Sequence, residues 1–211
     1  MKAALINGSP KQENSASAVI VDELKSILHE DMRLTEYSFR EPVVTMERMR
    51  EMSECDVWIF AFPLYVDSIP SHLLSCLMQL EDYLTELEDK EITVYTVVNC
   101  GFYEARQNAP ALDIMKNWCR KCGLIWGIGV GVGGGGMLPM LREIPSGRGP
   151  RKRLSRALAE LADDIKSRTA APDLMVKPGI PRFLYKIAAE MGWRQQIKKN
   201  GKDVKDLSIM V

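Results

Sequence analysis

The chain has no excess of charge of either sign and no long apolar run. Its 211 residues carry 28 Lys and Arg against 28 Asp and Glu. A net charge of zero gives no general reason to expect nucleic-acid binding, and no apolar run approaches the roughly 20 residues that span a bilayer. A predicted strand follows Met1-Lys2 directly, so we expect no signal peptide and a cytoplasmic protein without an integral membrane segment.

Cysteine and histidine are too few, and too scattered, for a metal site. Five cysteines without a signal sequence favour reduced thiols over a disulfide framework. Cys119 and Cys122 form a CxxC, yet the second ligand pair that a zinc or iron–sulfur site requires is missing. The pair lies with Trp118 on the apolar side of a helical pattern and is interpreted as core. His29 and His72 fall on different predicted helices, so neither a metal nor a Ser-His-Asp site is expected.

Two common phosphate-binding motifs are also missing from the first turn of the chain. It contains neither Gly-x-x-x-x-Gly-Lys-Ser/Thr nor Gly-x-Gly-x-x-Gly, which excludes a P-loop and a dinucleotide fingerprint there. Residues 129–134 formally match the second pattern, but their glycines alternate within a predicted strand and no helix follows directly. We interpret that run as a strand face without side chains, against which a helix or a ligand packs closely.

What the chain does have is a polar turn after its first apolar run. Residues 3–6 predict a buried strand that stops at Asn7-Gly8-Ser9-Pro10, and a helical pattern begins near Ser15. A helix N-terminus has unpaired N–H groups and a partial charge of roughly +0.5, which favours a bound anion. The side chains that can add hydrogen bonds to it are those of Ser9, Asn14, Ser15 and Ser17. A phosphate cradle is one interpretation, and ordinary helix capping and turn chemistry are the other.

Strand-like and helix-like segments alternate over the first 170 residues. Short apolar runs predict strands over residues 3–6, 32–37, 56–62, 92–99 and 124–132. Patterns with a 3.6-residue period predict helices over residues 15–29, 44–53, 70–87, 108–122 and 151–168. Strands that are apolar on both faces and alternate with helices predict a parallel sheet covered on both sides. We therefore expect an α/β fold with a doubly wound, five-stranded parallel sheet in the order 2-1-3-4-5.

Ligands of such sheets bind beyond the carboxyl ends of the strands. After the third predicted strand comes Pro63-Leu64-Tyr65-Val66-Asp67-Ser68-Ile69-Pro70, whose tyrosine can either pack or stack against a planar ring. After the fourth comes Asn99-Cys100-Gly101-Phe102-Tyr103-Glu104, whose glycine permits close backbone approach to a heterocycle; a glycine turn with two buried aromatics is the alternative. These two loops and the first turn are expected to converge on one crevice.

In these three segments the chain resembles the flavodoxin-like NAD(P)H-dependent FMN reductase family. The resemblance covers about residues 1–170, and the loop after the third strand is its most specific part. It implies that Ser9, Asn14, Ser15 and Ser17 hold the FMN phosphate, that Pro63–Val66 line the isoalloxazine and that Asn99–Phe102 bind its pyrimidine edge. Within the same motifs it also assigns cofactor binding to Lys11, Asp67 and Glu104. Many relatives have a Thr/Ser-Gly-Gly turn where this chain has Asn-Cys-Gly-Phe.

The resemblance implies an oxidoreductase that passes hydride or electrons from NAD(P)H through bound FMN to a small-molecule acceptor. The cofactor performs this chemistry, so no catalytic side chain is assigned. We expect FMN in preference to FAD, because the first turn offers a single phosphate cradle. The alternative is a flavodoxin-like FMN-binding electron carrier or redox sensor without NAD(P)H turnover, whose usual acidic charge is absent from this chain.

The composition changes after residue 170, so we divide the chain into an FMN-binding domain, residues 1–170, and a C-terminal extension, residues 171–211. The extension begins with a proline-containing linker and continues with a helix from Arg182 to about Trp193. An apolar stripe with basic neighbours is predicted on this helix, formed by Phe183, Leu184, Ile187, Ala188 and Met191. Such a helix can dock on its own domain or on a second subunit, or lie on a membrane surface. We favour docking and expect a homodimer.

Overall fold

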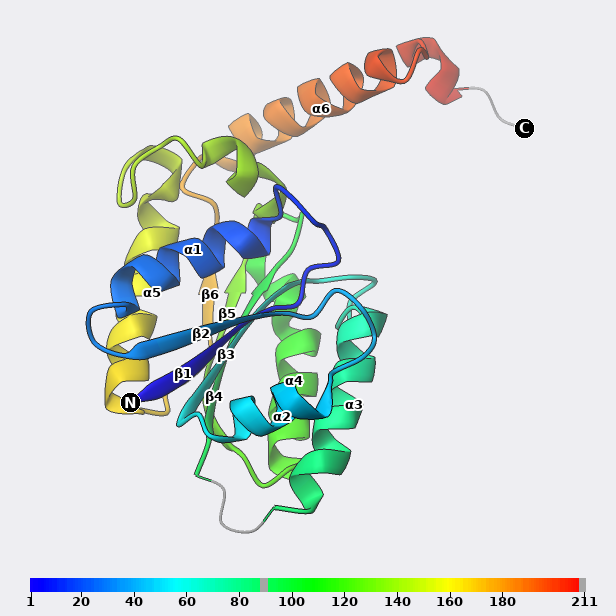
Figure 1. The fold of residues 1–211 in the computed structure, drawn as a ribbon. Helices are drawn as coiled ribbons and strands as arrows, with labels where there is room; N and C mark the ends of the chain where they lie inside the picture. The colour runs from blue at the N-terminus through cyan, green and yellow to red at the C-terminus, as the bar shows by residue number, and fades with distance from the viewer. Residues whose placement is uncertain (88–90, 209–211) are drawn as a thin grey trace. The chain divides into compact units, whose positions relative to one another are not determined.

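The computed structural model describes residues 1–87 and 91–208, and the chain divides into two compact units, Met1–Gly179 and Ile180–Val211. The first unit is a parallel sheet with helices on both faces (Figure 1). Its strands are β1 (Lys2–Asn7), β2 (Arg33–Ser38), β3 (Val57–Pro63), β4 (Thr93–Asn99), β5 (Ile125–Val132) and β6 (Leu174–Val176). Its α-helices are α1 (Ala16–Leu28), α2 (Met46–Ser53), α3 (Ser71–Thr85), α4 (Ala109–Lys121) and α5 (Lys152–Ser167). Short 3-10 helices lie at η1 (Ala105–Asn108), η2 (Gly135–Leu141) and η3 (Gly149–Arg151).

The strand order is β2-β1-β3-β4-β5-β6, with every neighbouring pair parallel. In the middle of the sheet Ile6 stands opposite Tyr37 on one side and Phe60 on the other. The α/β class and the order of the first five strands are confirmed. Because β1 lies between β2 and β3, the order of strands reverses at β1 and β3, and this switch point is where such sheets bind ligands.

The expectation of five strands is wrong, because β6 adds a sixth strand at the edge next to β5. Leu174 pairs with Val130 and Val176 with Val132. The carboxylate of Asp173 fixes this short strand by accepting hydrogen bonds from the Gly129 N–H at 2.8 Å and the Trp126 indole at 3.2 Å. The strand comes from the part of the sequence that we interpreted as a linker.

Two hydrophobic cores fill the space between the sheet and its helices. One lies between the sheet and helices α2, α3 and α4, and the other between the sheet and helices α1 and α5 (Figure 1). Side chains of β3 alternate between them: Trp58 and Phe60 belong to the first core and Ile59 to the second. This two-sided burial explains why the strand is an unbroken apolar run.

The alternating glycines of β5 leave room for neighbouring groups, as predicted for a strand face without side chains. A Cβ atom at Gly129 would come within 2.8 Å of Leu112 on α4. At Gly133, directly after the strand, it would come within 2.5 Å of the Tyr103 carbonyl oxygen. The 3-10 helix η2, not an α-helix, follows this strand, and helix α4 and its preceding loop take the space that the glycines leave.

All five cysteines are free and buried, including the CxxC pair Cys119 and Cys122. Both lie with Trp118 in the core beneath α4, so their interpretation as core residues is confirmed. Burial raises the pKa of Cys55 and of Cys76 to about 11, and it also raises the pKa of Cys119. These thiols therefore stay protonated, and hence poorly nucleophilic, in the folded protein at neutral pH.

We expect the free energy of unfolding to fall as the pH rises from about 8.5 to about 11. Thiols of the unfolded chain ionise near pH 8.5, whereas the folded protein keeps the protons of Cys55 and Cys76 until the pH reaches their raised pKa of about 11. Over that window the unfolded state binds fewer protons, so rising pH favours it. Urea unfolding at a series of pH values measures the slope, and a Cys55→Ala/Cys76→Ala variant should show a smaller one.

The second unit contains the helix α6 (Arg182–Lys199) and the 3-10 helix η4 (Val204–Ser208). Helix α6 is longer than the predicted helix, and none of its residues is buried. Its large apolar side chains are exposed, with Phe183 64%, Ile187 52%, Met191 57% and Trp193 72% accessible. Within residues 1–87 and 91–208, no helix combines the length and the apolar character needed to cross a membrane.

Candidate functional site

The first loop, between β1 and α1, is shaped by its own polar side chains. The Asn7 side chain accepts a hydrogen bond from the Ser9 N–H at 3.0 Å, and the Ser9 hydroxyl accepts one from the Lys11 N–H at 3.3 Å. Asn14 adopts the left-handed conformation, with φ 51°, which asparagine tolerates better than most residues. The chain then enters α1 at Ser15, whose hydroxyl caps the helix by accepting from the Ala18 N–H at 3.0 Å.

Three serine hydroxyls of this region are buried and keep their hydrogens for another acceptor. Ser9, Ser15 and Ser17 are 2%, 3% and 1% exposed. The oxygen of Ser17 accepts from the amide of Asn99 at 2.9 Å, and those of Ser9 and Ser15 accept from the backbone. Across the described part of the chain, none of the hydrogen bonds found uses these hydroxyls as donors. A group of spare donors at a helix N-terminus fits an anion.

Lys11 and Asn14 are exposed on the same loop, and two residues that the sequence analysis did not identify support its backbone. Arg40, which follows β2, donates a hydrogen bond to the Gln12 carbonyl oxygen at 3.1 Å. The Nε2 atom of His72, in the first turn of α3, lies 3.2 Å from the Gly8 carbonyl oxygen. Neither residue has a local sequence signal, because both contacts join segments that are far apart in the chain.

Asn99, at the end of β4, connects the first loop to the centre of the sheet. Its amide nitrogen donates to the Ser17 hydroxyl at 2.9 Å and to the Phe62 carbonyl oxygen at 3.0 Å. The backbone carbonyl oxygen of Asn99 accepts a hydrogen bond from the Leu64 N–H at 2.8 Å. Since both amide hydrogens are engaged with the protein, the Asn99 side chain acts in this structure as a support for Ser17.

The loop after β4 turns its cysteine inward and its phenylalanine outward. Cys100 is buried, its Sγ accepts from the Asn108 amide at 3.4 Å, and burial raises the pKa of its thiol. Phe102 is 55% exposed, and a Cβ atom added at Gly101 would meet no atom within 4 Å. Glu104 is half-buried directly before η1. Gly101 and Phe102 therefore present an open surface to a ligand, whereas the Cys100 side chain does not.

The loop after β3 forms a tight turn with strained backbone. Tyr65 and Ser68 exchange two backbone hydrogen bonds of 3.0 Å. Between them, Val66 and Asp67 have positive φ values of 49° and 57°, which is strained for a β-branched residue such as valine. Val66 is 98% exposed and Tyr65 is 42% exposed, while Pro63 and Leu64 are half-buried. The turn thus projects Tyr65 and Val66 away from the sheet at the carboxyl end of β3.

Backbone hydrogen bonds join the three loops at the carboxyl ends of the strands. The Gly8 N–H donates to the Ala61 carbonyl oxygen at 2.9 Å, which ties the first loop to β3. The bond from Leu64 to Asn99 ties the second loop to the third, and the Gly135 N–H donates to the Cys100 carbonyl oxygen at 2.7 Å. The residues predicted for phosphate and ring binding therefore follow neighbouring strands β1, β3 and β4, at the switch point of the sheet.

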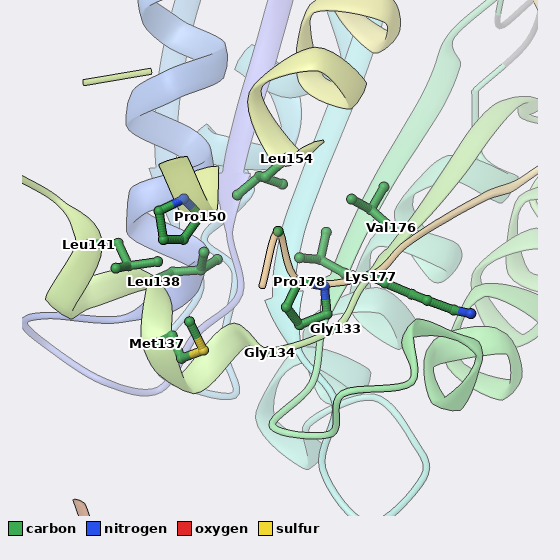
Figure 2. Close-up of a pocket in the computed structure, with 12 residues that line it drawn as sticks. Gly133, Gly134, Met137, Leu138, Leu141, Pro150, Leu154, Val176, Lys177 and Pro178 are labelled. Atoms are coloured by element: carbon green, nitrogen blue, oxygen red, sulfur yellow. The ribbon is translucent and has the colours of Figure 1, made fainter. Parts of the chain in front are cut away.

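A separate small pocket, partly open to solvent, lies at the carboxyl ends of β5 and β6 (Figure 2). The residues that line it include Gly133, Leu138, Leu141, Pro150, Leu154 and Val176. The residues predicted to bind a cofactor are not part of this lining. In residues 1–87 and 91–208, no group of three or more His, Cys, Asp or Glu side chains is placed to hold a metal ion.

No protein-family model matches the chain, and no curated protein matches its sequence. Solved structures do match it. The NAD(P)H:quinone oxidoreductase from Methanothermobacter marburgensis is 12% identical, with a TM-score of 0.60, over 78% of this chain and 96% of that one. An FMN-dependent NADH-azoreductase from Bacillus anthracis in complex with FMN is 11% identical, with a TM-score of 0.56, over 79% and 100%. A WrbA-like flavodoxin from Agrobacterium tumefaciens is 10% identical, with a TM-score of 0.51, over 77% and 98%.

These likenesses define the class of fold. The chain has the doubly wound α/β fold of flavodoxin-like proteins, and solved structures of this fold include NAD(P)H- and FMN-dependent oxidoreductases. The structural resemblance to flavodoxin-like FMN reductases that the sequence motifs indicated is thereby confirmed. At a sequence identity of 10–12%, these likenesses show the fold and not the activity.

Proposed function

We propose that the chain is an FMN-dependent oxidoreductase that takes hydride from NADH or NADPH and passes electrons to a small-molecule acceptor. The observation that carries the proposal is the group of buried Ser9, Ser15 and Ser17 hydroxyls at the start of α1, with hydrogens still available to an acceptor. Five free thiols, all buried, suit a reducing compartment such as the cytoplasm.

The residues at the switch point fit the two ends of FMN. The phosphate would be held by the serine hydroxyls together with the N–H groups of the first turn of α1, of which Ser15 caps only that of Ala18. The exposed Tyr65 and Phe102 come from the two following loops and offer flat apolar surfaces to the isoalloxazine ring. Bound FMN would supply the hydride and electron chemistry.

The protein's own contribution is to fix the cofactor and to keep competing groups away. Asn99 holds the Ser17 hydroxyl in place, and the bond from Leu64 to Asn99 fixes the distance between the loops that carry Tyr65 and Phe102. Burial raises the pKa of Cys100, so its thiol stays protonated and the site contains no nucleophilic thiolate from this residue. These residues bind and orient, and no proton transfer by a side chain is required.

The cofactor and the turnover are tested by two measurements on the purified protein. Extraction and chromatography of the bound flavin, or reconstitution with excess FMN, should yield FMN and not FAD. Anaerobic addition of NADH or NADPH should then bleach the flavin absorbance near its visible maximum. Flavin binding without bleaching by either nucleotide would favour the electron carrier, and the absence of any flavin binding would refute the proposal.

A further inference from the structure

We propose that helix α6 of one copy docks along the exposed face of helix α3 of a second copy, so that two chains exchange their C-terminal segments reciprocally. The proposal concerns an interaction surface, and it does not depend on the proposed function. It assigns a partner to the exposed apolar side chains Phe183, Ile187 and Met191 of α6, and it names the surface that receives them.

The two units of the chain carry opposite charge. Residues 180–211 contain seven basic side chains and three acidic ones, whereas residues 1–179 contain 21 basic and 25 acidic ones. The zero net charge of the whole chain therefore hides a basic C-terminal segment and an acidic main unit. Opposite charge steers two such surfaces together and selects against wrong partners.

Helix α6 has one sector that is apolar at its start and basic at its end. At 100° per residue, Phe183, Ile187 and Met191 fall within a sector of about 80°, and Arg194 and Lys198 continue the same sector toward the C-terminus. The three apolar side chains are 64%, 52% and 57% exposed. Arg194 has one local partner, Glu190, at 3.9 Å.

Helix α3 shows the matching order of chemistry on its exposed face. Leu74 and Met78, 43% and 60% exposed, lie four residues apart near its start. Asp82 and Glu86 continue the same spacing toward its C-terminal end and are exposed. Leu74 and Asp82 are about 12 Å apart along the axis, and Ile187 and Arg194 about 10 Å, at 1.5 Å per residue. Two parallel helices therefore bring apolar side chains against apolar ones and basic side chains against acidic ones.

The receiving helix belongs to a second copy because of the way the C-terminal segment leaves the first unit. Gly179 borders a pocket with Leu138 and Leu154, which belong to the core under α1 and α5. Helix α3 packs on the opposite face of the sheet. Ile180 and Pro181 alone separate Gly179 from α6, and two extended residues span only about 7 Å. To reach the exposed face of α3 in its own copy, the start of α6 would have to pass from the α1 and α5 side of the sheet to the other side and then around α3. A helix alone is about 10 Å across, so two residues are too short for this path.

The test uses charge reversal in the full-length protein, read by analytical ultracentrifugation. The wild type should sediment as a dimer. Arg194→Glu/Lys198→Glu should raise the dimer dissociation constant about 100-fold, and Asp82→Lys/Glu86→Lys should do the same, because attraction becomes repulsion at both reciprocal contacts. The control Lys186→Glu/Lys199→Glu makes the same change of charge outside the sector and should leave the dimer intact.

Mixing the two reversed variants in equal amounts decides which chain supplies the receiving helix. In the mixture both contacts regain opposite charges, so dimers should reappear as heterodimers. A wild type that is monomeric, or a mixture that stays monomeric, would overturn the proposal; so would charge reversal that leaves the dimer unchanged. Binding of the monomeric wild type to anionic phospholipid vesicles would assign α6 to a membrane surface instead.

Discussion

Replacing Ser9 and Ser17 together by alanine is expected to weaken FMN binding by about 10²- to 10⁴-fold. Each substitution removes a buried hydroxyl donor from a charged acceptor, and a hydrogen bond to a charged group contributes about 1.5–3 kcal/mol; every 1.4 kcal/mol is about tenfold in the dissociation constant. Fluorescence titration of the apoprotein measures the change. Both serines are almost fully buried, at 2% and 1% exposure, so water cannot easily replace the lost donors.

Riboflavin, which lacks the phosphate, separates phosphate binding from general damage to the site. Its dissociation constant should change little in the same variant, because its ring would meet the loops after β3 and β4. Ser26→Ala is the matched control, since Ser26 is exposed near the end of the same helix. Equal losses of FMN and riboflavin affinity would show that Ser17 matters through its bond to Asn99, and unchanged FMN affinity would place the phosphate elsewhere.

The sequence predicted most helices and strands because burial on one or both faces leaves a periodic pattern. The run from Asp56 to Phe62 predicted β3 within one residue at each end. The alternating glycines correctly indicated a strand face without side chains. The sixth strand was missed because it is only three residues long and lies between Pro172 and Pro178. Its position depends on a contact from Asp173 to Gly129, 44 residues away.

The candidate site was predictable where its chemistry is local. The side chains of Asn7, Ser9 and Ser15 form local hydrogen bonds with the backbone, so the residue types themselves indicate a turn and a helix cap. The connection between Ser17 and Asn99 spans 82 residues, so no sequence pattern reveals it. The same limit applies to Asn99, whose assignment to the ring stays a prediction: only the structure shows that its amide nitrogen donates to Ser17 and Phe62.

The turn after β3 shows a different limit. Val66 and Asp67 have positive φ values, which glycine or asparagine usually provides in such turns. Residue type therefore gave no signal for this backbone conformation, and the loop was identified by its place after the third predicted strand and by the resemblance. Strain of this kind persists only where the surrounding structure enforces it, and it concentrates at functional sites.

A buried ion pair between Arg151 and Glu23 holds the segment from residue 142 to 151 on α1, and Arg151→Met is expected to lower the free energy of unfolding by about 3–5 kcal/mol. The side chains are 8% and 3% exposed and lie 2.6 Å apart. Arg151 also donates to the carbonyl oxygens of Arg142 and Ile144, and Ser146 donates to Glu23. Removing the guanidinium would leave the carboxylate of Glu23 buried without its counter-charge.

Urea unfolding at neutral pH measures this loss of stability. Two further variants compare it with the loss of an exposed ion pair and with the removal of both buried charges. Arg156→Ala breaks the exposed pair with Glu160 and should cost no more than about 0.5 kcal/mol, as expected of a surface pair four residues apart. Glu23→Leu/Arg151→Met removes both charges and should recover much of the stability, because apolar pairs often replace buried ion pairs at little cost. A cost of less than about 1 kcal/mol for Arg151→Met would contradict this prediction, because water would then have to reach Glu23. Apolar contacts, chiefly that of Leu138 with the core beneath α1, would in that case hold residues 142–151 on the helix.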